Sequence, residues 1–531
     1  MVYESFMKTY PLCLLVITLL GFSGWATARV PASPALADYA TEANAAYHNL
    51  PGSLSAYNSA IRGICQAIQT GATQEFTASL NKLGVSFNPP RIRLPLRRVQ
   101  IAGSSPGSNV TEAGIPVVLG YETKTATLYP PEGLFVDATA IYDRSAGVAR
   151  FSLLVGRTTV MLRGHTYALA ANHSAAGDHL KLRAKRFGHS GFGGMIHPFS
   201  ASRRPQIYLL DPYDPNKIPL LMVHGLQSTP VAFAGLVNSL RADPEIRSKY
   251  QFWQFYYASG TPVLINAAAL RDNLAETVRA LDPQGHDAAM KRIVVVGHSM
   301  GGVISHTLVS TSGDRVWRSV FRVPPSELQG DPDAIRELER VLFFRRNPRV
   351  VRVIFMAAPH RGSPMADSFV GVVGNWLTRL DPMLDRGLSR LAVANTESMT
   401  PEAAAFYKGR FSAVRTLSSK STALIAVSRL PIEVPFHSVI GQRHPGPKEQ
   451  GSDGIVPYWS SHLDGAQSEV IVRSGHGVFS NPQAVQEVIR ILRLASREKR
   501  INSHVFARAG RVVSPRRPRQ KAVPKFGHSS L

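Results

Sequence analysis

The stretch Ile-Val-Val-Val-Gly-His-Ser-Met-Gly-Gly, residues 293–302, decides the fold class of this 531-residue chain. Its first half is a continuous apolar run, typical of a strand buried on both faces of a sheet. Its second half is rich in glycine and leads into a segment that can begin a helix. Gly-His-Ser occurs three times, at residues 188–190, 297–299 and 527–529. Only Ser299 follows an apolar strand and has glycine two residues to either side.

This pattern is the G-x-S-x-G nucleophile elbow, a sharp turn from strand to helix that holds a serine in a strained backbone. Side chains two residues either side of the serine would collide with the neighbouring strand and helix, so Gly297 and Gly301 fit those positions. The serine then lies at a helix N-terminus, where the dipole favours an oxyanion. We therefore predict that Ser299 is a nucleophile.

A serine nucleophile needs a base that is oriented by an acid, and in this architecture the chain order is Ser, Asp or Glu, His. His476 follows an apolar strand and precedes the last predicted helix, so it is the predicted base. Asp453 lies 23 residues earlier in a Gly-flanked loop and is the predicted acid, with Asp464 in reserve. An Asp-Gly pair is also a common turn, so position 453 has that second interpretation.

Three other histidines, His360, His437 and His462, are predicted to be packing or surface residues because of their places in the strand order. The predicted oxyanion hole takes one backbone amide from Met300 and one from Leu226, which follows the strand "KIPLLMVHG". His224 and His298 lie beside these residues, and we expect them to shape the loops rather than to react.

The chain exceeds the length that one hydrophobic core usually supports, so we expect two domains or one large domain with insertions. Alternating apolar strands and helices predict a parallel α/β sheet in the catalytic domain. The expected parts are a signal peptide (1–28), an N-terminal helical and β-rich domain (29–205), a catalytic domain (206–496) with cap insertions (about 312–348 and 366–433), and a basic tail (497–531). Within the N-terminal part, the polar stretch from about 174 to 204 is expected to be a linker or long loop.

The motifs "VHGLQS", "VVVGHSMGG", "FMAAPHRGSPMAD", "SDGIVPYWSSHL" and "GHG" resemble, in this order, those of the lipase and esterase branch of the α/β-hydrolase superfamily. The resemblance covers roughly residues 208–494 and implies an α/β-hydrolase fold with Ser299, Asp453 and His476 as the triad. "SDGIVPYWSSHL" looks like the acid-bearing segment of secreted bacterial lipases. Those lipases also carry a calcium site and a disulfide, and neither is matched here.

In such folds the cap insertions lie over the active site. Phe369, Val373, Trp376, Leu377 and Leu380 form an apolar stripe at helical spacing. The stripe has two interpretations, the lining of an acyl-chain pocket or the buried face of a cap helix, and the second is the commoner use of such stripes.

The first 28 residues have the pattern of a secretory signal, with an apolar run and a small-x-small site at Ala26-Thr27-Ala28. The run is too short to span a bilayer comfortably, which favours cleavage over anchoring. We expect an exported protein, periplasmic, secreted or attached to the cell surface. Cleavage would leave Cys65 alone, so no internal disulfide and no thiolate metal site are expected. The predicted chemistry needs no cofactor or metal.

The chain is basic, with 60 Lys and Arg against 36 Asp and Glu. Residues 497–531 hold ten of these cations and one acid, with several prolines, which predicts a disordered extension. Its functional interpretation is attachment to an anionic surface, and the alternative is a solvated tail without a partner. No nucleic-acid-binding motif accompanies it, so we expect no nucleic-acid partner.

Together these features predict a secreted serine hydrolase that cleaves carboxylic esters, lipid-like ones in particular. An acyltransferase or thioesterase with the same triad is the closest alternative. A non-catalytic surface-binding protein on a hydrolase scaffold is the alternative from another class.

Overall fold

The computed structural model describes residues 34–69, 73–103, 111–123, 127–186, 204–226, 228–365, 387, 390–407 and 416–498. The predicted signal peptide, the stripe from Phe369 to Leu380 and the basic tail beyond residue 498 lie outside these ranges. Of the three Gly-His-Ser triplets, only the one ending at Ser299 lies within them. Among the described helices, none is both long and apolar enough to cross a lipid bilayer.

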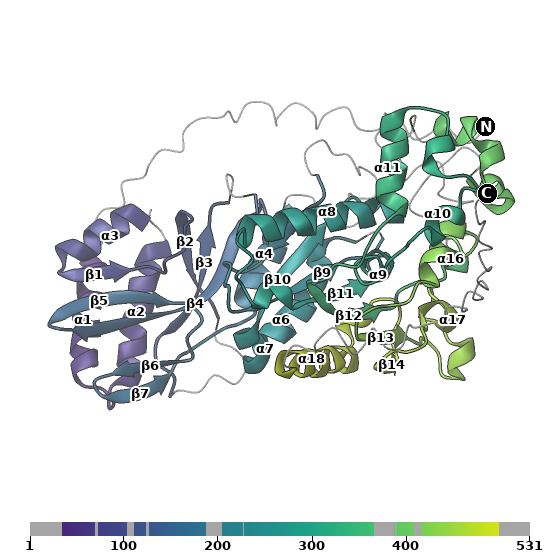
Figure 1. Cartoon of the computed structure of the whole chain (residues 1–531). Helices are drawn as coiled ribbons and strands as arrows, with labels where there is room; N and C mark the ends of the chain where they lie inside the picture. The colour runs from purple at the N-terminus through teal and green to yellow at the C-terminus, as the bar shows by residue number, and fades with distance from the viewer. Residues whose placement is uncertain are drawn as a thin grey trace, which may run out of the picture.

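The N-terminal part pairs helices with a sheet. Its sheet has the order β1-β5-β4-β3-β2, with β1 parallel to β5 and the other pairs antiparallel. Buried side chains of the helices and of this sheet form one hydrophobic cluster, at the left of Figure 1. The elements are α1 (Pro34–His48), α2 (Leu54–Gln69), α3 (Thr73–Lys82), β1 (Val85–Asn88), β2 (Leu96–Ile101), β3 (Ile115–Tyr121), β4 (Leu134–Ser145), β5 (Val148–Leu154) and the hairpin β6 (Thr159–Leu162) and β7 (His165–Ala168).

The segment predicted as a linker begins instead with a helix, α4 (Ala175–Arg186). Ala175 and Ala176 are buried against the N-terminal sheet beside Val118. Asp137 Oδ1 accepts a hydrogen bond of 2.8 Å from the Ala176 amide, an amide of the first turn that has no acceptor within the helix. The bond to Asp137 and the buried alanines therefore stabilise a helix that the polar sequence of this segment does not predict.

The second part contains a seven-stranded sheet with the order β14-β13-β12-β11-β9-β10-β8. All neighbours are parallel except the edge pair β8 and β10. The strands are β8 (Gln206–Leu209), β9 (Ile218–Val223), β10 (Tyr250–Tyr256), β11 (Ile293–His298), β12 (Val350–Met356), β13 (Phe436–Gly441) and β14 (Ser468–Val472). The predicted parallel α/β sheet is confirmed.

Helices cover both faces of this sheet. Alternate residues of each strand point to opposite faces, so apolar side chains of one strand pack against helices on both sides. Ile293 and Val295 of β11 pack in the cluster that includes α8 and α9. Val294 and Val296 pack in the cluster that includes α6, α7 and α18. These helices are α6 (Ala234–Ala242), α7 (Pro244–Lys249), α8 (Val263–Leu281), α9 (Met300–His306) and α18 (Pro482–Arg497).

Both predicted cap insertions contain helices, at the right of Figure 1. They are α10 (Arg315–Arg318) and α11 (Pro332–Leu342) in the first, α14 (Pro401–Tyr407) and α16 (Thr422–Ser428) in the second, with α17 (Tyr458–Ser461) after β13. Short 3-10 helices complete the described part: η1 (Pro230–Phe233), η2 (Ala289–Lys291), η3 (Pro325–Glu327), η4 (Thr396–Ser398), η5 (Lys448–Gln450) and η6 (Val478–Ser480).

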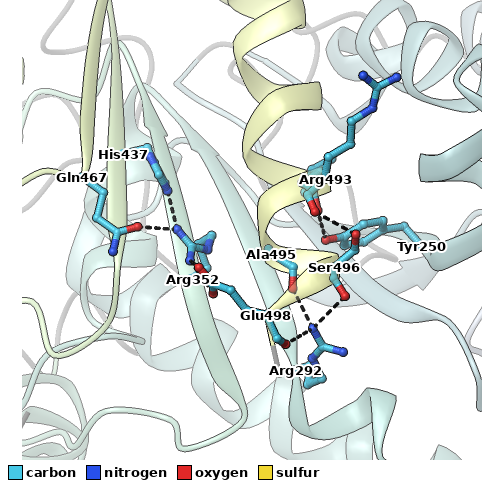
Figure 2. A network of polar contacts seen from close by, with 10 residues as sticks. Tyr250, Arg292, Arg352, His437, Gln467, Arg493, Ala495, Ser496 and Glu498 are labelled. Carbon is cyan, nitrogen blue, oxygen red and sulfur yellow. Dashed lines mark hydrogen bonds and ion pairs between the residues drawn. The ribbon is translucent and has the colours of Figure 1, made fainter. Parts of the chain in front are cut away.

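The last helix, α18, is held by hydrogen bonds from side chains at both of its ends. Asn481 caps its first turn by accepting from the amides of Gln483 and Ala484. At its C-terminus, Arg292 donates to the carbonyls of Ala495 (2.6 Å) and Glu498 (3.0 Å), as Figure 2 shows. The helix is thereby tied to the amino ends of the parallel strands, which we call the amino edge of the sheet.

Arg352 is the centre of this edge in Figure 2. Its side chain is 1% exposed and makes two bonds to the carboxylate of Glu498, of 2.8 and 2.7 Å. It also donates to His437 Nε2 (2.6 Å) and to Gln467 Oε1 (2.7 Å). A buried guanidinium with this many acceptors joins β12, β13 and the end of α18 into one unit.

Candidate active site

Ser299 lies at the turn between β11 and α9, at the opposite, carboxyl edge of the sheet. Its backbone has φ 55° and ψ −128°, a conformation that L-residues rarely adopt. The turn is held from both sides, since the Ser299 amide donates to the Met356 carbonyl and the Ser299 carbonyl accepts from Gly302. The surrounding strands thus maintain a strained serine, as expected of a nucleophile elbow.

The glycines of the elbow are required by close backbone contacts. A Cβ on Gly301 would lie 2.1 Å from the carbonyl oxygen of Val223. A Cβ on Gly297 would lie 2.6 Å from the Gly301 carbonyl. Because the opposing atoms are backbone, they cannot move aside without distorting β9 or α9. The steric reason for the G-x-S-x-G spacing is therefore present at both predicted positions.

The structure brings Ser299, His476 and Asp453 together in one chain of hydrogen bonds. His476 Nε2 lies 2.8 Å from Ser299 Oγ, and His476 Nδ1 lies 2.7 Å from Asp453 Oδ2. A carboxylate can only accept, so Nδ1 of His476 carries the proton and Nε2 of the neutral ring is free to accept from the serine. This arrangement can remove a proton from the hydroxyl and hold it on the imidazole.

Asp453 is oriented by its own loop. Its side chain is 1% exposed, and Oδ1 accepts from the amides of Ile455 (2.8 Å) and Val456 (2.7 Å). These two bonds leave Oδ2 directed at the imidazole. The Asp-Gly turn considered from the sequence and the contact with His476 are both present, since the turn presents the carboxylate.

The loop that follows β12 holds the acid-bearing segment in place, through contacts that the sequence motifs do not predict. Arg361 Nη1 donates to the carbonyls of Trp459 (2.7 Å) and His462 (2.5 Å). Ser363 Oγ donates to the Ile455 carbonyl (2.5 Å). The motifs "PHRGS" and "SDGIVPYWSSHL" are therefore two halves of one interlocked structure. In the sequence, only the polar residues Arg361 and Ser363, just after an apolar strand, could have indicated this contact.

The predicted oxyanion residues lie on two segments beside the nucleophile, the start of α9 and the loop after β9. Met300 is the first residue of α9 and is fully buried, so its amide belongs to the helix turn whose N–H groups lack intrahelical acceptors. Leu226 follows Gly225, where an added Cβ would lie 2.8 Å from Ser299 Cβ. The backbone of the Leu226 loop thus runs directly against the serine side chain.

Two buried histidines, His224 and His298, lie beside the triad, and both are neutral at ordinary pH. Burial lowers the pKa of His224 to about 4, and its ring stacks on Tyr257 with 4.2 Å between centroids. Burial also lowers the pKa of His298 to about 3, with the nearby His476 ring contributing. Neutral neighbours do not oppose a positive charge on His476.

The other candidates lie elsewhere. His360 is buried beside His306, with 3.4 Å between their Nδ1 atoms, and His437 belongs to the Arg352 cluster of the amino edge. His462 lies between Glu469 (2.5 Å) and Asp464 (3.2 Å). The reserve acid Asp464 is 94% exposed and contacts His462 rather than His476.

An apolar cavity of about 80 Å³ lies among the start of α8, α11 and α16. Val263 and Leu264, which follow β10 at the carboxyl edge, form part of its wall, and Leu338 and Leu424 from the cap insertions form another part. Thr416 Oγ1 accepts from the Val263 amide (3.2 Å) and so ties the second insertion to this wall. The cavity is therefore built jointly by the sheet edge and the caps.

Comparisons with known proteins give no family model and no curated protein that matches the chain. Among solved structures, the mature Bacillus licheniformis lipase BlEst2 is similar over 55% of this chain and 99% of its own, with 16% identity and a TM-score of 0.34. Its propeptide form is similar over 56% and 55%, with 15% identity and a TM-score of 0.33. A lipase-esterase related protein from Clostridium acetobutylicum ATCC 824 is similar over 54% and 99%, with 14% identity and a TM-score of 0.28.

The strand order and the elbow characterise the fold independently of these likenesses. The sheet is parallel apart from its β8 edge, helices cover both faces, and a strained serine follows the central strand β11. Asp453 comes after a later strand, β13, and His476 after the last one, β14. The second part of the chain has the α/β-hydrolase fold.

Proposed function

We propose that this protein is a serine hydrolase that cleaves carboxylic esters, with lipid-like esters as its substrates. The observation that carries the proposal is the continuous set of hydrogen bonds from Ser299 through His476 to Asp453. It combines a strained, nearly buried hydroxyl with a base in the required tautomer. A scaffold that only binds a surface has no use for this strain.

In the proposed reaction, Ser299 Oγ attacks the ester carbonyl carbon while its proton passes to His476 Nε2. The amides of Leu226 and Met300 bind the oxyanion, a contribution of about 3 kcal/mol for each donor. The imidazolium then gives its proton to the leaving alkoxide, and an acyl-enzyme and an alcohol result. Water, deprotonated by His476, releases the acid. Asp453 keeps the tautomer and stabilises the imidazolium throughout.

The apolar cavity between α8 and the cap insertions is evidence for a substrate with an apolar acyl group. Its described lining is mostly apolar, with the polar side chains of Glu337, Thr416 and Ser421 among it, and its wall includes the start of α8 at the carboxyl edge, the edge where Ser299 also lies. Burying an acyl chain there would contribute about 0.8 kcal/mol for each methylene. Esters with an apolar acyl group are therefore the proposed substrates. The N-terminal signal pattern supports action after export, and the basic tail supports attachment to an anionic surface.

Hydrolysis of p-nitrophenyl esters from butyrate to palmitate tests this function. The protein lacking residues 1–28 should be active, and its Ser299→Ala variant should lose activity about 10³-fold or more. Ser190→Ala, in another Gly-His-Ser triplet, is the matched control and should keep full activity. A fluorophosphonate should label the wild type and Ser190→Ala, but it should not label Ser299→Ala.

Product analysis separates the alternatives. Free acid as the main product supports hydrolysis, whereas acyl transfer to an added alcohol in preference to water supports a transferase. Equal inertness of the wild type and Ser299→Ala toward all esters, with no fluorophosphonate labelling, would refute the proposal. Thioester substrates run in parallel show whether the leaving group is sulfur rather than oxygen.

A further inference from the structure

His298, the residue before the nucleophile, contacts the loop that carries the base. Its Nε2 lies 2.8 Å from the backbone carbonyl oxygen of His476. A carbonyl oxygen can only accept, so Nε2 must carry the proton. The elbow therefore holds the base twice, through Ser299 to the ring and through His298 to the main chain.

The loop that carries the base needs such a tether. His476 is flanked by Gly475 and Gly477, both exposed, and glycine leaves a backbone unusually free. Asp453 acts on the ring and sets its tautomer, but it does not act on the main chain of residue 476. The bond from His298 acts on that main chain, from a buried position at the end of β11.

The surroundings of His298 keep it a donor rather than a titrating group. Its ring packs edge-on against Phe479, with 4.7 Å between centroids, and lies 4.9 Å from the His476 ring. Desolvation, together with the nearby rings of His476 and His224, lowers the pKa of His298 to about 3, although Asp453 and the bond to the His476 carbonyl act in the opposite direction. A positive His298 would oppose the imidazolium that the reaction forms on His476.

We propose that His298 is a positioning residue that fixes the main chain of His476 relative to Ser299 by donating a hydrogen bond to the His476 carbonyl. This inference rests on the proposed hydrolase function. It predicts that the donor at the Nε2 position matters, and that the ability to ionise does not. Misplacing a base by about 1 Å can cost about 100-fold in rate.

Three substitutions separate donor, reach and volume. Glutamine places its amide N–H near the position of Nε2, asparagine reaches only the position of Nδ1, and methionine fills similar volume without a donor. We expect His298→Gln to keep kcat within about threefold. His298→Asn and His298→Met should lose about 10- to 100-fold in kcat with KM changed less than about threefold.

The control is His437→Met, which removes another buried, hydrogen-bonded histidine at the amino edge of the sheet. It should lower the midpoint of unfolding and leave kcat within about threefold. The rate of fluorophosphonate labelling should follow the same order as kcat among the His298 variants. The acidic limb of the kcat/KM profile should coincide in wild type and His298→Gln, because position 298 does not titrate there.

The results distinguish this inference from the proposed function. An inactive wild type would refute the function itself. An active wild type with Ser299→Ala inactive, but with glutamine, asparagine and methionine equal at position 298, would refute the role of His298. If His298→Met does not fold, the glutamine and asparagine pair decides, and equal kcat in that pair overturns the proposal. A shift of the acidic limb in His298→Gln also overturns it.

Discussion

The two edges of the seven-stranded sheet use polar groups in opposite ways. At the carboxyl edge, Ser299 has a strained backbone and a hydroxyl shared with a partly exposed imidazole. At the amino edge, Arg352 is completely buried and bonded to three partners in regular geometry. One edge maintains an unfavourable conformation, and the other locks strands and the last helix together. The comparison suggests that the amino edge stabilises the frame against which the elbow is strained.

The largest expected effect is on the rate, from Asp453→Asn. Asparagine can keep its oxygen on the amides of Ile455 and Val456, which leaves its NH₂ facing His476 Nδ1. The imidazole must then accept at Nδ1 and carry its proton on Nε2, so it cannot take the proton of Ser299. We expect kcat to fall about 10³- to 10⁴-fold at pH 7.5 with little change in the unfolding midpoint. A loss below tenfold would contradict the role of this acid.

Gly301→Ala should damage both the rate and the fold. The added methyl would lie 2.1 Å from the Val223 carbonyl oxygen and 2.4 Å from that of His224, so the elbow must shift. We expect at least 100-fold loss of kcat together with destabilisation of about 2 kcal/mol. Gly235→Ala, in helix α6 at a position with no neighbouring atom within 4 Å, is the comparison for replacing a helical glycine without a steric conflict. An active, stable Gly301→Ala protein would show that the elbow is not sterically constrained.

Arg352→Met should affect stability and spare the rate. It leaves the carboxylate of Glu498 and the ring of His437 without their shared donor at the amino edge. We expect a loss of about 2 to 4 kcal/mol in the free energy of unfolding, measured in urea by tryptophan fluorescence. The kcat measured well below the unfolding midpoint should stay within about twofold. A large loss of kcat in a folded variant would mean that the two edges are coupled more closely than proposed.

The smallest effect is the contribution of His437 to the pH dependence of stability. Burial, with Arg352 nearby, lowers its pKa in the folded protein to about 4, against an ordinary value of 6.5. Between these values the unfolded chain binds a proton that the folded chain refuses. The stability contributed by the neutral ring is thus complete above pH 6.5 and is lost as the pH falls toward 4.

A single proton gives a slope of at most about 1.4 kcal/mol per pH unit in this window. His437→Gln should therefore make the loss of unfolding free energy between pH 6.5 and 5 shallower than in the wild type. His224 and His298 contribute in the same direction at the other edge, so some slope should remain. Identical slopes in the two proteins would contradict the lowered pKa of His437.

Much of the candidate site could be predicted because its constraints are local. The positions of Gly297 and Gly301 follow from steric contacts across one turn, and the order of Ser299, Asp453 and His476 follows from the order of strands. The start of α4 could not be recognised, since the acceptor of its first-turn amide, Asp137, is 39 residues away in β4 of the N-terminal sheet. The clamp formed by Arg361 and Ser363 joins segments about 90 to 100 residues apart, for which single residues in a motif give no partner.

The sequence by itself determined the parallel sheet, the elbow and the three residues that meet there, because periodicity and turn sterics act between near neighbours in the chain. Only the tertiary structure decided which groups hold those residues in place. The bond from His298 to the His476 carbonyl spans 178 residues, and the Arg352 cluster gathers β12, β13 and the end of α18. Such contacts depend on where whole elements pack, and burial then lowers the pKa of the enclosed histidines His298 and His437.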